Sequence, residues 1–184
     1  PELVKIINGL LGMVSLFFVY QIIRQLGGYW HATLGLAIYV LTPKLSQYWP
    51  VVLTEPIFMF FNLVWLWAII KMSYTNSRYY LVLAVLSLSL ATLTRATYIY
   101  LIYFLFVFSV LYILFCTSAH RQLVRNICVM SGATIAILWF YITKNIIAFD
   151  FQGIATGIGN ALYLGNHPFF GGAVPTFNGN VIDV

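Results

Sequence analysis

Charged side chains are scarce in this sequence. Asp, Glu, Lys and Arg make up 7% of its 184 residues, against roughly 25% in an ordinary soluble domain, and 62% of the residues are hydrophobic. A surface this poor in charge would not keep a protein dispersed in water. Apolar runs long enough to cross a hydrocarbon core about 30 Å thick recur along the chain. The composition therefore excludes a soluble globular domain and predicts an all-α, polytopic transmembrane bundle.

Other absences exclude particular chemistries. The two cysteines, Cys116 and Cys128, have neither CxxC spacing nor a neighbouring His cluster, so we expect inert thiols and no metal site. No Walker loop, dinucleotide fingerprint, zinc-protease motif or nucleophile elbow occurs, and no cofactor is expected. The net charge of +5 comes from basic residues scattered singly along the chain, which argues against nucleic acid as a partner.

Hydropathy divides the chain into about six membrane segments. The expected spans are residues 3–26, 31–41, 51–72, 79–94, 96–116 and 126–148. The second span is too short for a comfortable crossing and is followed by Pro43 and Pro50, so tilted, broken and re-entrant forms stay open. We expect residues 1–148 to form an incomplete transmembrane domain, and residues 149–184 to begin an outer loop.

One charge interrupts the long apolar stretch from Tyr79 to Cys116, and it belongs to Arg95. The stretch is far longer than one crossing needs, so the chain must turn within it. At a rise of 1.5 Å per residue, Arg95 lies about 24 Å beyond Tyr79, near the far edge of the hydrocarbon. We therefore expect a tight hairpin that carries Arg95 at the membrane boundary.

The positions of the charges predict an orientation. Basic residues fall at three expected connections, namely Arg24, then Lys71 and Arg78, then His120, Arg121 and Arg125. The positive-inside bias makes these connections cytoplasmic. Alternation then gathers four charges on the outer side: Glu55, Arg95, Lys144 and Asp150. Because ionisable groups at membrane depth are costly and usually face a polar cavity or one another, we expect a polar site at this boundary.

Each candidate residue also has a simpler interpretation. Glu55 precedes Pro56 at the start of a helix, where a carboxylate interacts favourably with the helix dipole without any other role. Arg95 is either a snorkelling anchor or a ligand for an anionic headgroup, whose phosphate a guanidinium fork matches. Lys144 and Asp150 are weaker candidates, since a Lys that ends a transmembrane helix is more often a headgroup anchor. Asn145, Asn160, Asn166 and His167 offer hydrogen bonds that orient a sugar, although Asn also simply makes loops.

Four local motifs occur in an order that is more informative than any one of them. They are Leu53-Thr-Glu-Pro-Ile-Phe58, Leu90-Ala-Thr-Leu-Thr-Arg95, Tyr141-Ile-Thr-Lys-Asn145 and Leu162-Tyr-Leu-Gly-Asn-His-Pro168. This series resembles the dolichyl-phosphate-mannose-type glycosyltransferases of the GT-C superfamily, which include protein O-mannosyltransferases and lipid A aminoarabinose transferases. The resemblance runs from about Leu3 to the end of the chain. It implies a polyprenyl-phosphate sugar donor, transfer to a lipid, glycan or protein acceptor on the periplasmic or luminal face, and no divalent metal.

The resemblance also implies roles for particular residues. Arg95 would contact the donor phosphate, Glu55 would help to form the polar site with Asn145, and Asn166 and His167 would belong to an outer loop. Lys144 stands where the family usually has Arg in a Trp-x-x-Arg-Asn motif, and Lys cannot reproduce the bidentate fork. The family's catalytic acid would lie upstream of Pro1, so the catalytic residue is unknown and this stretch is expected to be inactive by itself.

Two other functions stay open. A transporter or flippase of a lipid-linked or small anionic substrate would place its charges near the middle of the membrane. A purely structural subunit would tolerate neutralisation of Arg95 and Glu55. No Asn-x-Ser/Thr sequon occurs, which favours a bacterial plasma membrane over a luminal compartment.

Overall fold

The computed structural model describes residues 2–42, 55–75, 77–116, 121–149, 153–154, 176–177 and 180–181. It divides the chain into two compact units, Pro1–Phe140 and Tyr141–Val184, and each is described by itself. The helices are α1 (Glu2–Leu41), α3 (Glu55–Thr75), α4 (Arg78–Thr94), α5 (Tyr98–Phe115) and α6 (Arg121–Phe149). In the second unit, β1 (Thr176–Phe177) and β2 (Asn180–Val181) form a short antiparallel pair.

The helices confirm the predicted class. Four helical spans among the described residues are long and apolar enough to cross a membrane: Ile6–Leu41, Glu55–Thr75, Tyr98–Phe115 and Arg121–Ala148. α4 is a shorter apolar helix. The helix α1 is divided at Gly28 into two arms. Counted with α3, α4, α5 and α6, these arms give six described helical segments, in agreement with the prediction of about six. The chain is therefore a polytopic, all-α integral membrane protein.

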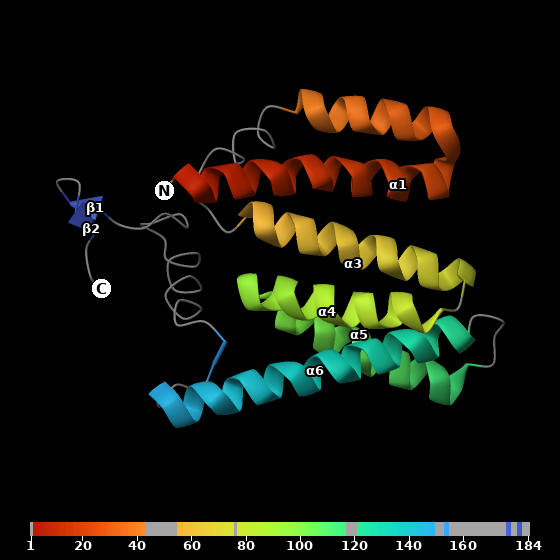
Figure 1. Ribbon diagram of the computed structural model, residues 1–184. Helices are drawn as coiled ribbons and strands as arrows, with labels where there is room; N and C mark the ends of the chain where they lie inside the picture. The colour runs from red at the N-terminus through yellow and green to blue at the C-terminus, as the bar shows by residue number, and fades with distance from the viewer. Residues whose placement is uncertain are drawn as a thin grey trace. The chain divides into compact units, whose positions relative to one another are not determined.

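A reversal at Gly28 divides α1. The backbone of Gly28 has φ 84° and ψ −176°, a conformation that almost only glycine adopts. Figure 1 shows the second arm folded back along the first, and a Cβ at Gly35 would collide with the side chain of Ile23. Residues 2–27 extend about 39 Å, enough to cross the hydrocarbon, whereas residues 29–41 extend about 20 Å. The predicted short second segment is therefore one arm of a helical hairpin.

The helices α1, α3 and α4 lie side by side within the first unit (Figure 1), and aromatic side chains join them. Phe18 of α1 packs edge-on against Phe60 and Trp67 of α3, with ring centroids 5.9 and 5.5 Å apart. Trp67 in turn packs edge-on against Tyr80 of α4 at 5.5 Å. Edge-to-face pairs of this kind contribute about 0.5–1.5 kcal/mol each beyond the burial of their area. They fix which faces of the three helices meet.

Small residues let α4 approach α3 closely. The buried side chains of α4 are Ala84, Ser87, Leu88, Ser89, Ala91 and Thr92. Their hydroxyls bond within the helix, as when Ser87 and Thr92 donate to the carbonyls of Leu83 and Leu88 at 2.7 Å. Interhelical hydrogen bonds therefore do not explain this contact. Small side chains permit close backbone approach and van der Waals packing, which drives helix association in lipid.

α6 begins earlier than predicted. The sequence pattern suggested residues 126–148, but the helix starts at Arg121, so Arg121 and Arg125 lie on its first turns and not in a connection. Hydropathy marks only the hydrocarbon-embedded part of a helix, and a helix extends past that boundary because its backbone hydrogen bonds are internal. His120, the third basic residue assigned to this connection, lies outside the described residues.

Replacing Gly28 tests the reversal in α1. We expect Gly28→Ala to lower the stability of the protein by about 1–3 kcal/mol, because an L-residue at this φ and ψ is strained. Gly9→Ala is the matched control, since its Cβ would meet open space inside the first arm and alanine favours helix. Thermal unfolding in detergent measures both. Equal melting temperatures for the two variants would contradict the reversal.

Candidate active site at the Glu55–Arg95 ion pair

Two predicted site residues meet at one end of α3 and α4. Glu55 is the first residue of α3, and Arg95 follows the last residue of α4, where its backbone N–H donates to the carbonyl of Ala91 at 2.9 Å. The Arg95 Nη2 lies 3.3 Å from the Glu55 Oε1. The backbone N–H of Tyr98 donates to the carbonyl of Arg95 at 3.0 Å, which closes the turn into α5. The predicted hairpin is confirmed, with Arg95 at its tip.

Aromatic and amide side chains continue the site toward the membrane interior. The Arg95 guanidinium carbon lies 5.3 Å from the centre of the Phe58 ring, a cation–π contact. The ring of Phe58 packs edge-on against Tyr98 at 4.8 Å. The Tyr98 hydroxyl donates to the Asn62 Oδ1 at 3.0 Å. One face of α3 thus carries Glu55 and Phe58, which both contact Arg95, and Asn62, which binds Tyr98.

The ion pair leaves hydrogen-bonding capacity available. The Arg95 side chain is 49% exposed, so the pair contributes only about 0–1 kcal/mol to stability. In the part of the chain that the structure describes, Glu55 is the one hydrogen-bond partner of the guanidinium, which carries five N–H donors. The second carboxylate oxygen, Glu55 Oε2, is buried without a hydrogen-bond partner. The site therefore retains exposed N–H donors for an anion.

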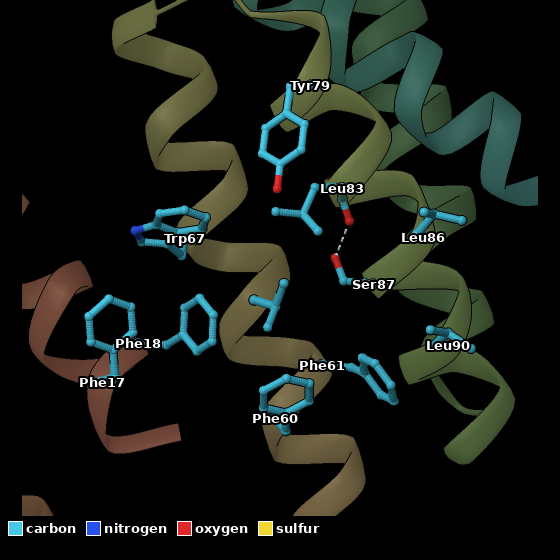
Figure 2. A pocket seen from close by; sticks show the side chains of 11 residues that line it. Phe17, Phe18, Phe60, Phe61, Trp67, Tyr79, Leu83, Leu86, Ser87 and Leu90 are labelled. Carbon is cyan, nitrogen blue, oxygen red and sulfur yellow. Dashed lines mark hydrogen bonds between the residues drawn. The ribbon is translucent and has the colours of Figure 1, made fainter. Parts of the chain in front are cut away.

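An apolar groove begins near the ion pair and runs along α4 away from Arg95. It has a volume of about 540 Å³ and is bordered by α1, α3 and α4 (Figure 2). Its lining residues are Phe17, Phe18, Phe60, Phe61, Val64, Trp67, Tyr79, Leu83, Leu86, Ser87 and Leu90. Leu90 comes five residues before Arg95, about 7.5 Å along the helix, and Tyr79 comes about 24 Å before it. The groove therefore extends over about 16 Å, roughly half of the thickness of the hydrocarbon core.

The second unit contains two further predicted site residues. Lys144 Nζ lies 5.4 Å from the centre of the Tyr141 ring, a cation–π contact. Asn145 is buried, and its Nδ2 donates to the carbonyl of Gly153 at 2.9 Å. This contact holds the chain after α6 and gives Asn145 a structural role. Asn160, Asn166, His167 and Asp150 lie outside the described residues.

Three residues of the site, Phe58, Asn62 and Tyr98, were not predicted as site residues from the sequence. A signal was present, because Asn62 follows Glu55 by seven residues and so lies on the same face of α3. A polar amide inside an apolar run is itself unusual and marks a polar surface. Tyr98 was hidden among the many aromatic residues, and only the turn at Arg95 brings it to Asn62. Among the described residues, no group of three His, Cys, Asp or Glu side chains could hold a metal ion.

Helical architecture and a polar site at the helix ends define a class: polytopic α-helical membrane proteins with a polar site at the end of the membrane helices. A family model described as dolichyl-phosphate-mannose-protein mannosyltransferase matches residues 3–143. The chain belongs to this family, which places it among the membrane glycosyltransferases of the GT-C superfamily. No curated protein and no solved structure matches the chain.

Proposed function

We propose that this protein transfers a sugar from a polyprenyl-phosphate donor, and that Arg95 binds the phosphate of that donor. The observation that carries the proposal is the position of the guanidinium, which lies at the end of α4 above a groove of about 540 Å³. A lipid-linked sugar phosphate has the matching parts, an anionic head and a long apolar tail. A guanidinium binds phosphate through parallel N–H donors and stays charged at membrane depth.

The proposed chemistry is a displacement at the anomeric carbon of the sugar. The acceptor hydroxyl attacks this carbon and loses its proton to a base, while the bond from carbon to the phosphate oxygen breaks. Negative charge accumulates on the departing prenyl phosphate, and Arg95 stabilises it there. Glu55 acts as a positioning residue through its 3.3 Å contact with Arg95.

The prenyl tail of the donor would lie in the apolar groove. The groove is lined almost entirely by hydrocarbon and aromatic groups, and its end at Leu90 is one to two helical turns from Arg95. Figure 2 shows the Tyr79 hydroxyl directed into the opposite end of the groove. Because the tail enters the groove from lipid and not from water, van der Waals packing against the groove walls holds it there.

The transfer site faces the periplasmic or outer side in this proposal. In the first unit, Lys71, Arg78 and Arg121 lie at or near the helix ends opposite to Glu55 and Arg95. Cytoplasmic ends carry an excess of Lys and Arg, so the Glu55–Arg95 end lies on the other side. The location of Glu55 and Arg95 at helix ends also favours the transferase over a transporter, whose site is built near the middle of the membrane.

Removal of the guanidinium tests the role of Arg95. We expect Arg95→Ala to lower kcat/KM for sugar transfer by at least ~100-fold, because loss of one preorganised donor to a developing anion costs that much. Arg95→Lys should retain intermediate activity, since it keeps the charge and loses the fork. The measurement is transfer from a purified polyprenyl-phosphate sugar in proteoliposomes containing the full membrane protein.

Arg78→Ala is the control for this experiment, because it removes an exposed arginine at the opposite end of α4. The melting temperature of each variant accompanies the assay. An Arg95→Ala protein that folds and transfers sugar at the wild-type rate would refute phosphate binding by Arg95 and leave it as a membrane anchor.

Filling the groove tests the position of the prenyl tail. Leu86→Trp should raise KM about 10-fold for a long-chain donor, equivalent to about 1.4 kcal/mol, and leave KM for a donor with two isoprene units nearly unchanged. Val107→Trp is the matched control, because Val107 is as exposed as Leu86 but lies on α5, away from the groove. An equal effect on long and short donors would place the tail elsewhere.

Cysteine labelling in intact bacterial cells tests the side of the site. One variant combines Thr97→Cys with Cys116→Ser and Cys128→Ser, and the other keeps Cys116 and carries only Cys128→Ser. We expect a membrane-impermeant maleimide to label the cysteine at position 97 in intact cells, and to label Cys116 only after permeabilisation, because the two exposed positions lie at opposite ends of α5. The reverse pattern would place the site in the cytoplasm.

A further inference from the structure

A small basic cavity lies at the other end of α5. It has a volume of about 330 Å³ and is lined by Ile113, Arg121, Gln122 and Arg125. Ile113 lies near the end of α5, and the three polar residues lie on the first turns of α6. From Tyr98 to Phe115, α5 rises about 27 Å, close to the thickness of the hydrocarbon core. The cavity and Arg95 therefore belong to opposite membrane boundaries.

Side-chain hydrogen bonds hold one of the two guanidinium groups in place. The Arg125 Nη2 donates to the Gln122 Oε1 at 2.6 Å. The Nε2 of the same glutamine donates to the Asn126 Oδ1 at 3.2 Å, which fixes the orientation of the amide. The remaining N–H groups of Arg125 are donors for a ligand. Because its direction is set beforehand, Arg125 loses less conformational entropy on binding than a freely rotating arginine would.

No carboxylate neutralises this cavity among the residues whose side chains the structure describes. The one acidic residue in that set is Glu55, and it pairs with Arg95. Arg121 and Arg125 therefore present two positive charges one helical turn apart. An anion with several oxygen atoms matches this arrangement, and a phosphate accepts bidentate hydrogen bonds from guanidinium groups.

The surroundings of the cavity select an amphiphile over a soluble ion. Ile113 forms its apolar wall, and the neighbouring Leu114 and Phe115 are 69% and 81% exposed. These side chains face hydrocarbon at the level where lipid headgroups begin. We propose that the cavity binds the phosphate of an anionic phospholipid whose acyl chains lie against α5. This lipid occupies the leaflet opposite to the donor site, and its binding does not depend on sugar transfer.

Lipid titration of the intact protein tests this proposal. The protein is held in an uncharged detergent, and its melting temperature is followed while phosphatidylglycerol, phosphatidylcholine or inorganic phosphate is added. We expect phosphatidylglycerol alone to raise the melting temperature. In the double variant Arg121→Gln/Arg125→Gln, the lipid concentration at half-maximal shift should rise at least ~10-fold, because both guanidinium contacts are lost.

Arg24→Gln/Arg78→Gln is the matched control, since it removes two exposed arginines from the same membrane side and lies outside the cavity. It should respond to phosphatidylglycerol like the wild type. Gln122→Ala keeps both charges and should still weaken binding about 3-fold, because Arg125 is no longer held. If the double variant does not fold, the response of Gln122→Ala to phosphatidylglycerol tests the proposal by itself.

Three results would overturn the proposal: an equal shift with phosphatidylcholine, a full shift with inorganic phosphate alone, or equal responses of the two double variants. Arg95→Ala separates this proposal from the proposed sugar transfer. It should lose transfer and keep the wild-type response to phosphatidylglycerol, because Arg95 lies at the other membrane boundary.

Discussion

Hydrocarbon offers no hydrogen-bond partner to a peptide group, and the rest of this structure depends on that constraint. Every backbone N–H and C=O within the membrane must be paired inside the protein, which makes the spans helical. The same constraint moves polar connections to the boundaries. It explains why Arg95 ends α4 at the tip of a three-residue turn, and why α6 continues as a helix through Arg121 and Arg125. Arg95 and Arg121 therefore both lie at helix ends.

The arginines at the two ends of the first unit have different neighbours. At one end, Arg95 meets Glu55 at 3.3 Å and the ring of Phe58 at 5.3 Å, so a single cation is placed among a carboxylate, an aromatic face and a groove. At the other end, Arg121 and Arg125 border a cavity without a described carboxylate. In the two proposals, the guanidinium paired with a carboxylate binds the donor phosphate, and the two guanidinium groups without a described carboxylate bind a lipid phosphate. The difference arises from what lies beside each arginine.

Packing among the helices follows from the absence of a hydrophobic driving force in lipid. Close contact requires small residues, as on the buried face of α4, or interlocking aromatic rings, as between Phe18 and Trp67. Aromatic rings keep neighbouring backbones apart where they do not interlock, and the groove lies in the space they leave between α1, α3 and α4. The feature that stabilises the bundle also provides room for an apolar chain.

The sequence by itself determined the class, the approximate spans and the hairpin at Arg95. The length of an apolar run decides whether it crosses the bilayer, and charged residues mark where the crossing ends, so both can be read from local sequence. It also placed Glu55 and Arg95 on one side by alternation. It did not reveal the reversal at Gly28, which needs a backbone conformation, or the contact of Tyr98 with Asn62, which joins residues 36 apart. Only the tertiary structure decided which faces meet, because helix–helix registry depends on the shapes of side chains that are distant in the chain.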